Sequence, residues 1–360
     1  MKKKLPLITL FICIFSLTVI LIQRYFLPSH WIFGFMYLSI PVILIVNILL
    51  VILKLWYRPI HVIYPLVVLI FSYSQFKETY GFGSPRIKSK NTFSVSSYNV
   101  GTFNYYRWHQ IEDTLATIES INWISSNISS DILCIQEFYN NDALVAESTL
   151  DEIRESEYPY YYTNPIKKSS HQGFFGIITF SKFPILKGGA VFFGDSSLNR
   201  GVFIDVLINS DTVRILNIHM KSMSIRIDSS TSIKNPSSII NNTYSIAEKL
   251  KNGFEERNKE VQTIGEFIDA SPHKLIVCGD FNDTPYSYTY QFIKRKLTNS
   301  FEETGKGFGF TYNKFPYFIR IDQQFYSKGI QAESFKVVNN NKYSDHLPIE
   351  GRYSFTKIKQ

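Results

Sequence analysis

Acidic and amide side chains follow directly after an apolar, strand-like run near residue 280. The run LIVCG over residues 275–279 leads at once into Asp280, Asn282 and Asp283. A buried strand gains no packing energy from ending in this way, so the pattern indicates a polar site at a strand end. Asp and Asn also favour turns and helix starts. For this stretch on its own, a capped turn is therefore the alternative.

Four more places along the chain carry polar side chains of the same kinds beside apolar runs. They are Asn99 after residues 93–98, Glu137 after 131–136, His219 after 213–218, and Asp345 with His346 ahead of 347–348. Functional residues collect at strand ends on a rigid sheet, so five such places indicate one shared site. Carboxylate and amide oxygens are ligands for Mg²⁺, Mn²⁺ or Ca²⁺, and histidine acts in acid–base chemistry. Together they suit metal-assisted attack of water on a phosphate ester.

The elements that must position these residues include both helices and strands. Apolar residues at helical spacing predict helices over residues 111–128 and 244–268. Residues 222–242 are rich in Ser and Asn, and we expect a loop there. Besides the strands that end in the candidate residues, the patterns predict strands over 173–180 and 318–326 and a hairpin of 202–208 with 213–218.

Several motifs in order give the sequence a resemblance to the endonuclease/exonuclease/phosphatase family. That family includes pancreatic-type deoxyribonucleases, AP endonucleases, neutral sphingomyelinases and inositol-phosphate 5-phosphatases. The motifs are SYN ending at Asn99, IQE ending at Glu137, GIITFSKFPI over 176–185, NIH ending at His219, GDFND over 279–283, and SDH ending at His346. Each motif is weak alone, and the ordered set over residues 91–356 is specific. The resemblance implies a four-layer α/β/β/α sandwich with its site at one end of two packed sheets.

The resemblance also implies a role for each residue that handles the metal and the attacking water. Glu137 matches the family's principal metal-binding glutamate, with Asn99 beside it. Asp345 matches a carboxylate near the metal. Asp280 and Asn282 match the pair that handles the attacking water and the phosphate. The base that deprotonates the water stays open between Asp280 and a histidine.

The remaining matched residues are two histidines, an acid and an arginine. His346 matches the essential histidine and Asp322 the acid that orients it, and such an acid fixes the tautomer and favours the imidazolium. His219 matches a second histidine of the deoxyribonuclease and sphingomyelinase branches. Arg200 resembles a phosphate-contacting arginine, since a guanidinium binds phosphate oxygens bidentately. One departure concerns residues 171–181, which hold no acid where the deoxyribonuclease branch has a glutamate that supports the second histidine.

Two of these residues also have ordinary structural explanations. Asn99 fits the end of a strand as a cap, and Asn217, in the run 213–218, is equally open between a cap and a function. Asp322 stands two residues from Arg320 and fits an ordinary ion pair with it. The sequence keeps both explanations open beside the functional ones.

The N-terminal part of the chain is apolar and long enough to cross a membrane. Charge-free runs, which need about 20 residues to span the hydrocarbon core, predict helices over about 5–23, 31–53 and 59–76. Residues 77–90 are predicted to be a linker, and 91–360 the family domain. Lys2 to Lys4 favour a cytoplasmic start, and three spans then place the domain on the extracytoplasmic side. Lys77 and three further basic residues up to Lys90 argue for the opposite side.

The charge distribution separates the two parts. The formal charge is +8, yet residues 1–90 hold ten Lys/Arg against one acid, so they carry +9 and residues 91–360 carry −1. The family domain therefore has no bulk charge that favours a polyanion, although a local basic patch stays possible. The three cysteines form no zinc or disulfide pattern, and we expect free thiols.

These observations predict a membrane-anchored, Mg²⁺- or Mn²⁺-dependent phosphoesterase of the phosphodiesterase or endonuclease type. Its partners would be the lipid bilayer and a phosphoester substrate, either nucleic acid or phospholipid. A sphingomyelinase-like phospholipid hydrolase or an inositol-phosphate hydrolase is the first alternative. A catalytically idle membrane scaffold that keeps the fold is the second, although a scaffold has no need of all five residues Glu137, Asp280, Asn282, Asp345 and His346.

Overall fold

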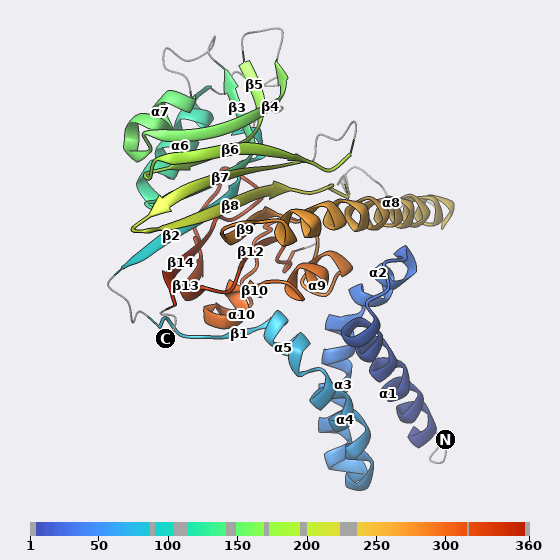
Figure 1. Cartoon of the computed structure of the whole chain (residues 1–360). Coiled ribbons are helices and arrows are strands. Elements are labelled where there is room, and N and C mark those ends of the chain that lie inside the picture. Colours follow the sequence, from blue (N-terminus) through green and yellow to red (C-terminus); the bar gives the residue numbers. More distant parts are fainter. Residues whose placement is uncertain are drawn as a thin grey trace. The chain divides into compact units, whose positions relative to one another are not determined.

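The computed structural model describes residues 5–86, 91–103, 114–141, 149–168, 173–194, 200–223, 236–314 and 317–356. The chain forms two compact units (Figure 1). One consists of Met1–Tyr80, Met223–Asn258 and Thr284–Phe292. The other consists of Gly81–Ser222, Lys259–Asp283 and Ile293–Gln360.

Two six-stranded sheets form the larger unit. The first sheet has the order β13 (Ile330–Val337), β14 (Ile349–Phe355), β2 (Thr92–Asn99), β3 (Ile132–Asn141), β5 (Gly173–Ser181) and β4 (Tyr160–Lys168). The second has the order β10 (Thr298–Asn299), β12 (Asp322–Tyr326), β9 (Lys274–Asp280), β8 (Asp211–His219), β7 (Arg200–Ile208) and β6 (Ile185–Phe192). The pairs β2–β3 and β8–β9 are parallel, and the other neighbours are antiparallel.

The two sheets pack face to face, and helices cover their outer faces (Figure 1). The core between the sheets takes alternate residues of each strand, such as Ile204 of β7 and Ile276 of β9. Because side chains alternate along a strand, Phe203 lies on the opposite face of β7, where it packs on Phe267 of α8 (Pro236–Asp269) with ring centroids 5.2 Å apart. On the first sheet the outer face packs with α6 (Thr114–Asn127) and α7 (Thr149–Glu157). The predicted four-layer α/β/β/α sandwich is confirmed.

The predicted hairpin is present as β7 and β8, with Asn209 at the turn in the left-handed region at φ 58°. The predicted helix over 244–268 lies within α8, but the loop prediction is wrong for residues 236–242, which begin this helix. Ser and Asn have low helix propensity, yet extending a helix that already exists adds one hydrogen bond per residue and is easier than starting one. Residues 224–235 of that predicted loop lie outside the described part.

Other boundaries differ from the sequence patterns. The strand predicted from residue 318 begins only at Asp322, because Phe318 has a φ of 69° and cannot continue an extended ladder. The prediction did not include β4, β6, β13 and β14, whose pairing with distant strands is not visible in local periodicity. Residues 111–113 of the predicted first helix are outside the described residues.

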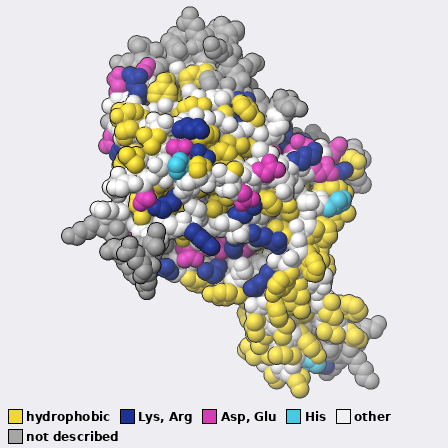
Figure 2. All heavy atoms as spheres, in the orientation of Figure 1, with side chains coloured by type: hydrophobic (Ala, Val, Ile, Leu, Met, Phe, Trp, Pro, Cys, Tyr) yellow, Lys and Arg dark blue, Asp and Glu magenta, His cyan; other side chains and the backbone are white. Residues whose placement is uncertain are grey.

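Apolar helices make up most of the smaller unit. They are α1 (Leu5–Leu21) with a π-helical turn to Phe26, α2 (Trp31–Leu38), α3 (Ile40–Tyr57), α4 (Ile63–Phe71) and α5 (Tyr73–Thr79). Two stretches, Leu7–Phe26 and Trp31–Tyr57, are long and apolar enough to cross a membrane. Figure 2 shows apolar side chains over much of their surface, and Phe11 is 70% exposed. Exposed apolar surface of this extent is typical of protein–protein or membrane contacts.

The third predicted span is broken. Residues Pro59–Phe71 and α5 bend by 61° at Ser72, so they count as one span only if this bent pair is taken together. The Ser72 hydroxyl donates to the carbonyl of Val68 at 2.8 Å, a bond that competes with the helical ladder and bends helices. By length and composition the described part of the chain therefore holds two candidate membrane helices, or three with the bent pair.

Amide side chains connect these helices with the segment Thr284–Phe292 inside the same unit. Gln23 Nε2 donates to the carbonyl of Tyr286 at 2.7 Å, and Gln75 Nε2 donates to Gln23 Oε1 at 2.6 Å. The Tyr286 hydroxyl lies 2.7 Å from Thr79 Oγ1. The helical unit thus includes residues well beyond the N-terminal region.

The stretch predicted as a linker contains ordered elements. Lys77–Thr79 complete α5, and β1 (Gly81–Phe82) pairs with β11 (Lys306–Gly307). Residues 87–90 lie outside the described part. The three cysteines are free and buried, as the sequence predicts.

Candidate active site

Four of the predicted site residues lie in one row across the second sheet. Arg200 of β7 pairs with His219 of β8, His219 pairs with Asp280 of β9, and Asp280 pairs with Asp322 of β12. Neighbours in one row project to the same face of a sheet. The register alone therefore brings an arginine, a histidine and two carboxylates together.

Asp280 is the centre of the site. Its side chain is 1% exposed. Four nitrogens surround its Oδ2: Asn99 Nδ2 at 3.0 Å, Asn282 Nδ2 at 3.1 Å, and the Nε2 atoms of His219 and His346 at 3.7 Å each. Its Oδ1 accepts from the backbone N–H of Asn282 at 2.8 Å. A buried carboxylate is stable only with such partners, and here they come from both sheets.

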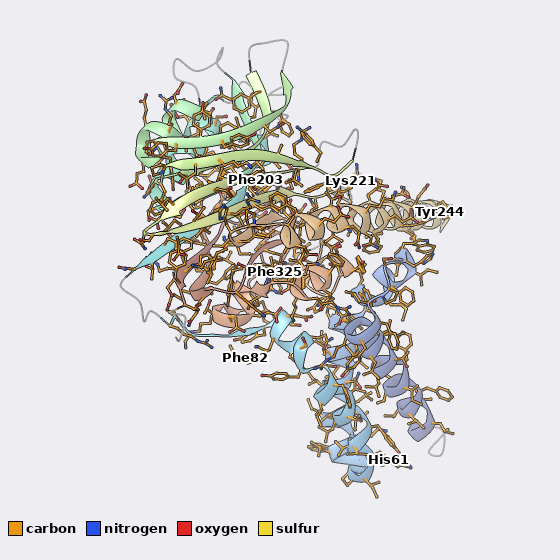
Figure 3. The ribbon with its side chains drawn as sticks, viewed as in Figure 1. His61, Phe82, Phe203, Lys221, Tyr244 and Phe325 are labelled. Carbon is orange, nitrogen blue, oxygen red and sulfur yellow. The ribbon has the colours of Figure 1, made fainter. Side chains whose placement is uncertain are left out.

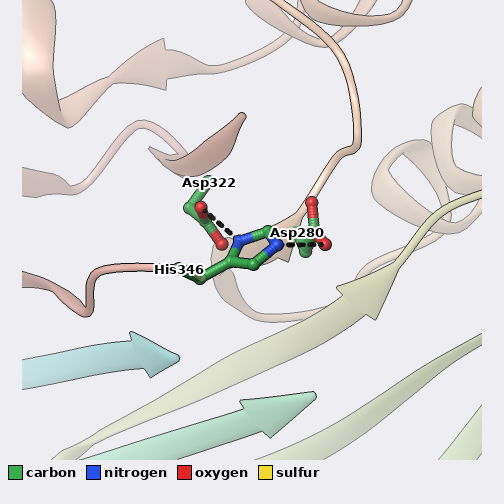
Figure 4. Close-up of side chains that lie close together, drawn as sticks. All are labelled: Asp280, Asp322 and His346. Atoms are coloured by element: carbon green, nitrogen blue, oxygen red, sulfur yellow. Dashed lines mark hydrogen bonds and ion pairs between the residues drawn. The ribbon is translucent and has the colours of Figure 1, made fainter. Parts of the chain in front are cut away.

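Asp322 and His346 form a buried acid–imidazole pair (Figure 4). His346 Nδ1 lies 2.9 Å from Asp322 Oδ2, so Nε2 is the nitrogen that points to Asp280. Burial lowers the pKa of His346, but the negative charges of Asp322, Asp280 and Asp345 outweigh it and raise the pKa to about 10. Burial raises the pKa of Asp322, and His346 opposes that rise. The pair favours an imidazolium, and Asp322 binds His346 as the sequence predicts.

Glu137 enters the site from a bulge in β3. Its φ is 51°, and the register of β3 against β5 shifts between Ile135 and Phe138. A bulge of this kind turns a side chain away from the regular alternation, and a non-glycine residue with positive φ is uncommon. Glu137 Oε1 lies 3.2 Å from Asn99 Nδ2 and 3.6 Å from His219 Nε2. Its side chain is 31% exposed, so it is the more accessible of the two central carboxylates.

Asn99 connects the two central carboxylates. Its Nδ2 donates to both Glu137 and Asp280, while its Oδ1 accepts from the N–H of Gly101 at 3.0 Å. Asn99 therefore caps the end of β2 through Oδ1 and also contacts both carboxylates of the site through Nδ2. In this orientation its amide nitrogen, not its oxygen, faces the carboxylates.

The second histidine lies between the same two carboxylates. His219 Nε2 is 3.6 Å from Glu137 Oε1 and 3.7 Å from Asp280 Oδ2, and this buried atom has no hydrogen-bond partner among the residues that the structure describes. The segment 173–181, which lacks the supporting acid, supplies Thr179, whose hydroxyl accepts from Asn217 instead. The carboxylates near His219 Nε2 are therefore those of Glu137 and Asp280, and the segment 173–181 contributes none.

Arg200, Asn282 and Asp345 lie around this centre. Arg200 Nη1 donates to Asn164 Oδ1 at 2.8 Å, and its guanidinium lies over the ring of Phe192 at 5.1 Å. Asn282 has a φ of 50° and donates from Nδ2 to the carbonyl of Met220 at 2.9 Å. Asp345 lies beside Gly101, in the turn that follows Asn99. A Cβ placed on Gly101 would be 3.6 Å from Asp345 Oδ1.

The donor atoms of the site fit a hard divalent cation. One donor atom each from Asp280, Asp322 and His346 lie within 4.8 Å of one another. In that group Asp322 Oδ2 and His346 Nδ1 already bind each other at 2.9 Å. Glu137 adds a partly exposed carboxylate beside the orphaned Nε2 of His219. Carboxylates with a nearby amide suit Mg²⁺ or Mn²⁺ better than a soft metal.

Comparison with known proteins settles the family. The sequence model of the endonuclease/exonuclease/phosphatase family matches residues 96–346. The chain belongs to this family. A second model, a domain of unknown function (DUF8431), matches residues 2–79. No curated protein matches the sequence of this chain.

Solved structures share the family fold at low sequence identity. A Beutenbergia cavernae endonuclease/exonuclease/phosphatase has 12% identity and a TM-score of 0.53, covering 74% of this chain and 72% of its own. The human nocturnin catalytic domain with bound sulfate has 17% identity and a TM-score of 0.50, covering 77% and 100%. TDP2 from D. rerio with a single-strand DNA product has 15% identity and a TM-score of 0.50, covering 74% and 100%.

A buried polar network around Asn217 connects the two sheets of this family member, and the sequence does not predict its contacts. Asn217 of β8 is 0% exposed and reaches across to the first sheet, where its Nδ2 donates to the carbonyls of Ile135 at 3.3 Å and Ile178 at 3.0 Å. Its Oδ1 accepts from Gln136 Nε2 at 2.6 Å. Ile135 and Gln136 precede Glu137 at the bulge, so Asn217 holds the bulged backbone. The only sequence signal is an asparagine within the apolar run 213–218.

We expect Asn217→Ala to destabilise the protein strongly. It removes the hydrogen bonds to the buried carbonyls of Ile135 and Ile178 and to the Gln136 amide, which keeps only its bond to Ser97 Oγ, at a cost of about 2–4 kcal/mol or roughly 5–10 °C in the unfolding midpoint. The measurement is thermal unfolding of the purified full chain in detergent. The control is Asn127→Ala, since Asn127 is exposed and makes one bond to Trp123 O. Equal midpoints for the two variants would contradict the cross-sheet role.

Proposed function

We propose that the chain is a membrane-anchored, divalent-metal-dependent phosphoesterase that cleaves a phosphate ester by attack of water. The observation that carries the proposal is the grouping of a buried Asp322–His346 pair, the buried carboxylate of Asp280 and the partly exposed carboxylate of Glu137 at one end of the two sheets. This is the equipment of metal-assisted hydrolysis. Membership of a phosphoesterase family supports the same reaction class.

In this proposal Glu137 is the principal metal ligand, with Asp345 and Asn99 completing the set from the protein. The bound ion would stabilise the negative charge that develops on the phosphoryl group and the leaving oxygen. Asn99 contributes through Oδ1 only with its amide reversed from the present orientation, and amide orientation is assigned from the hydrogen-bond network.

The other residues bind the phosphate and handle protons. Asp280 takes the proton of the attacking water, because it is the carboxylate at the centre of the site, and Asn282, which donates to Asp280 Oδ2, orients the water and the phosphate. His346 donates from Nε2 to a phosphoryl oxygen while Asp322 holds Nδ1. His219, in the same row, donates to a second oxygen. Arg200 adds a cation at the edge of the row.

Hydrolysis by the purified full chain in detergent tests the proposal. With Mg²⁺ we expect cleavage of bis-p-nitrophenyl phosphate and of at least one among plasmid DNA, sphingomyelin and phosphoinositides, and none with EDTA. His346→Ala and Glu137→Ala should each lower the rate by about a hundredfold or more.

His273→Ala is the matched control, since His273 precedes the start of β9, at the other end of the strand from Asp280. Undiminished activity in the His346 or Glu137 variant would refute the site assignment. If the wild-type chain cleaves no phosphoester, the result favours the alternative that the protein is a catalytically idle membrane scaffold.

The pH dependence tests the role of Asp322. The pKa of His346 is raised to about 10, so its imidazolium is present at neutral pH and is lost as the pH rises through that value. Asp322→Asn removes one of the charges that raise this pKa, whereas burial continues to lower it. We expect the alkaline limb of kcat to move down by about 1–2 pH units. Asp211 lies at the turn end of β8, far from His346, so Asp211→Asn should leave the alkaline limb of kcat unchanged. An equal shift of that limb in both variants would exclude a specific effect of Asp322 on His346.

We also propose that the family domain lies on the extracytoplasmic side. Lys2 to Lys4 favour a cytoplasmic N-terminus, and Lys54 with Arg58 favour a cytoplasmic loop after the second span. The bent pair then crosses once more. An alkaline phosphatase fused after Tyr80 should be active, and a green fluorescent protein fused there should not fluoresce. Fused after Arg58, the phosphatase should be inactive and the green fluorescent protein should fluoresce. Fluorescence at both positions would mean that the bent pair re-enters without crossing.

A further inference from the structure

A group of aromatic rings stands exposed on the loop between α10 (Ser300–Thr304) and β12. We call Phe308, Phe310, Tyr317 and Phe318 the aromatic patch. Phe308 is 49% exposed, Tyr317 56% and Phe318 75%. The rings touch each other: Phe308 stacks on Phe310 at 5.1 Å, and Phe310 meets Phe318 edge to face at 5.5 Å. Exposed apolar clusters of this kind indicate a binding surface.

The loop that carries the patch is fixed to the candidate active site. The backbone N–H of Leu347 donates to the carbonyl of Thr311 at 2.7 Å, and that of Asn313 donates to the carbonyl of Asp345 at 2.9 Å. The Tyr312 ring packs edge to face on the imidazole of His346, with centroids 5.3 Å apart. The buried hydroxyl of Thr311 accepts from the N–H of Asp322 at 3.2 Å. The patch is therefore a rigid neighbour of the Asp322–His346 pair.

A short tether limits how far the loop can lie from the apolar helices. β11, at the start of the loop, pairs with β1, and Phe82 of β1 is 76% exposed (Figure 3). Phe82 follows the last residue of α5, Thr79, by three residues, which span at most about 10 Å. Even if the membrane ended at Phe71, α5 would add only about 10 Å of helix. The length of the chain therefore limits the distance between the end of α5 and the strand β1 that pairs with the start of this loop.

The charge of the loop fits the same surroundings. Residues 305–321 contain three basic residues and no acid. Lys306 and Lys314 are exposed. Aromatic rings and lysines together are favoured at the lipid headgroups, where the rings are partly buried and the ammonium groups reach water and phosphate. Phe318 holds this exposed position with a φ of 69°, which is costly for a bulky side chain and is retained where it serves a function.

We infer that the aromatic patch inserts into the headgroup region of the bilayer that the N-terminal helices span. The inference rests on the proposed function where it concerns substrate: a site held against the membrane by the patch takes phosphoesters of membrane lipids. Aromatic rings also stack on the bases of single-stranded nucleic acid. The tether and the apolar helices favour the bilayer, and a nucleic acid is the competing result of the test.

The depth of Phe318 in a bilayer tests the inference directly. A nitroxide on Phe318→Cys in the full chain, reconstituted in anionic phospholipid vesicles, should collide with oxygen more than with a water-soluble nickel chelate. The native cysteines are buried and do not compete for the label. Leu207→Cys is the matched control: it is 44% exposed near the far end of β7 from Arg200, and its label should collide mainly with the chelate.

A label at residue 318 that stays as accessible to the chelate as the one at residue 207 overturns the inference. Immobilisation of that water-exposed label by an oligonucleotide would identify the competing occupant.

A hydrolysis ratio tests the consequence for substrate. The double variant Phe308→Ser with Phe318→Ser should lower the ratio of vesicle phospholipid hydrolysis to bis-p-nitrophenyl phosphate hydrolysis by about tenfold, since two rings leave the interface. Leu207→Ser should keep the wild-type ratio. An unchanged ratio in the double variant overturns the substrate inference. If the wild type hydrolyses neither compound, the proposed function fails, and the label depth still decides the membrane contact.

Discussion

The buried carboxylate of Asp280 is the constraint on which the site depends. At 1% exposure an ionised carboxylate must have nearby N–H groups or positive charge, or its burial would cost several kcal/mol. Asn99 at the end of β2 and His219 at the end of β8 supply them, together with His346, three residues before β14, and Asn282, two residues after β9. Packing the two sheets differently at this end would leave Asp280 without some of these partners. The geometry that makes the fold stable is the same geometry that collects the reactive groups.

Backbone conformation enforces this arrangement. Gly279 has a φ of 145°, and a Cβ there would stand 2.0 Å from the carbonyl oxygen of Ile218. A glycine before Asp280 is thus required for β9 to lie close to β8 and bring Asp280 into register with His219. Glu137 and Asn282, which both face Asp280, have positive φ without being glycine. Strain of this kind persists only where surrounding contacts over-determine it, and here the Asn217 network and the Met220 carbonyl provide them.

The sequence predicts much of the site because the fold places the ends of several strands together. Asn99, His219 and Asp280 each end a strand whose period is visible locally, so their convergence follows once two sheets are assumed. The sequence predicts Glu137 as a site residue because an acid follows an apolar run. It does not predict the bulge, because the register shift appears only in the pairing of β3 with β5. Asn217 stays open between a cap and a function in the sequence, because its partners across the core are not visible in local pattern. The break at Ser72 was missed because hydropathy does not register a side-chain hydrogen bond within a helix.

The lone pairs of the site bear on where a divalent ion would bind. Both oxygens of Asp280 accept N–H bonds, and Nδ1 of His346 is committed to Asp322. An ion among these three residues would have to displace hydrogen bonds that are themselves buried and costly to lose. Glu137 is 31% exposed, and an ion beside it would replace water rather than protein partners. The desolvation balance therefore favours Glu137 as the anchor of the ion, while Asp280 and His346, the latter held by Asp322, stay in place beside it.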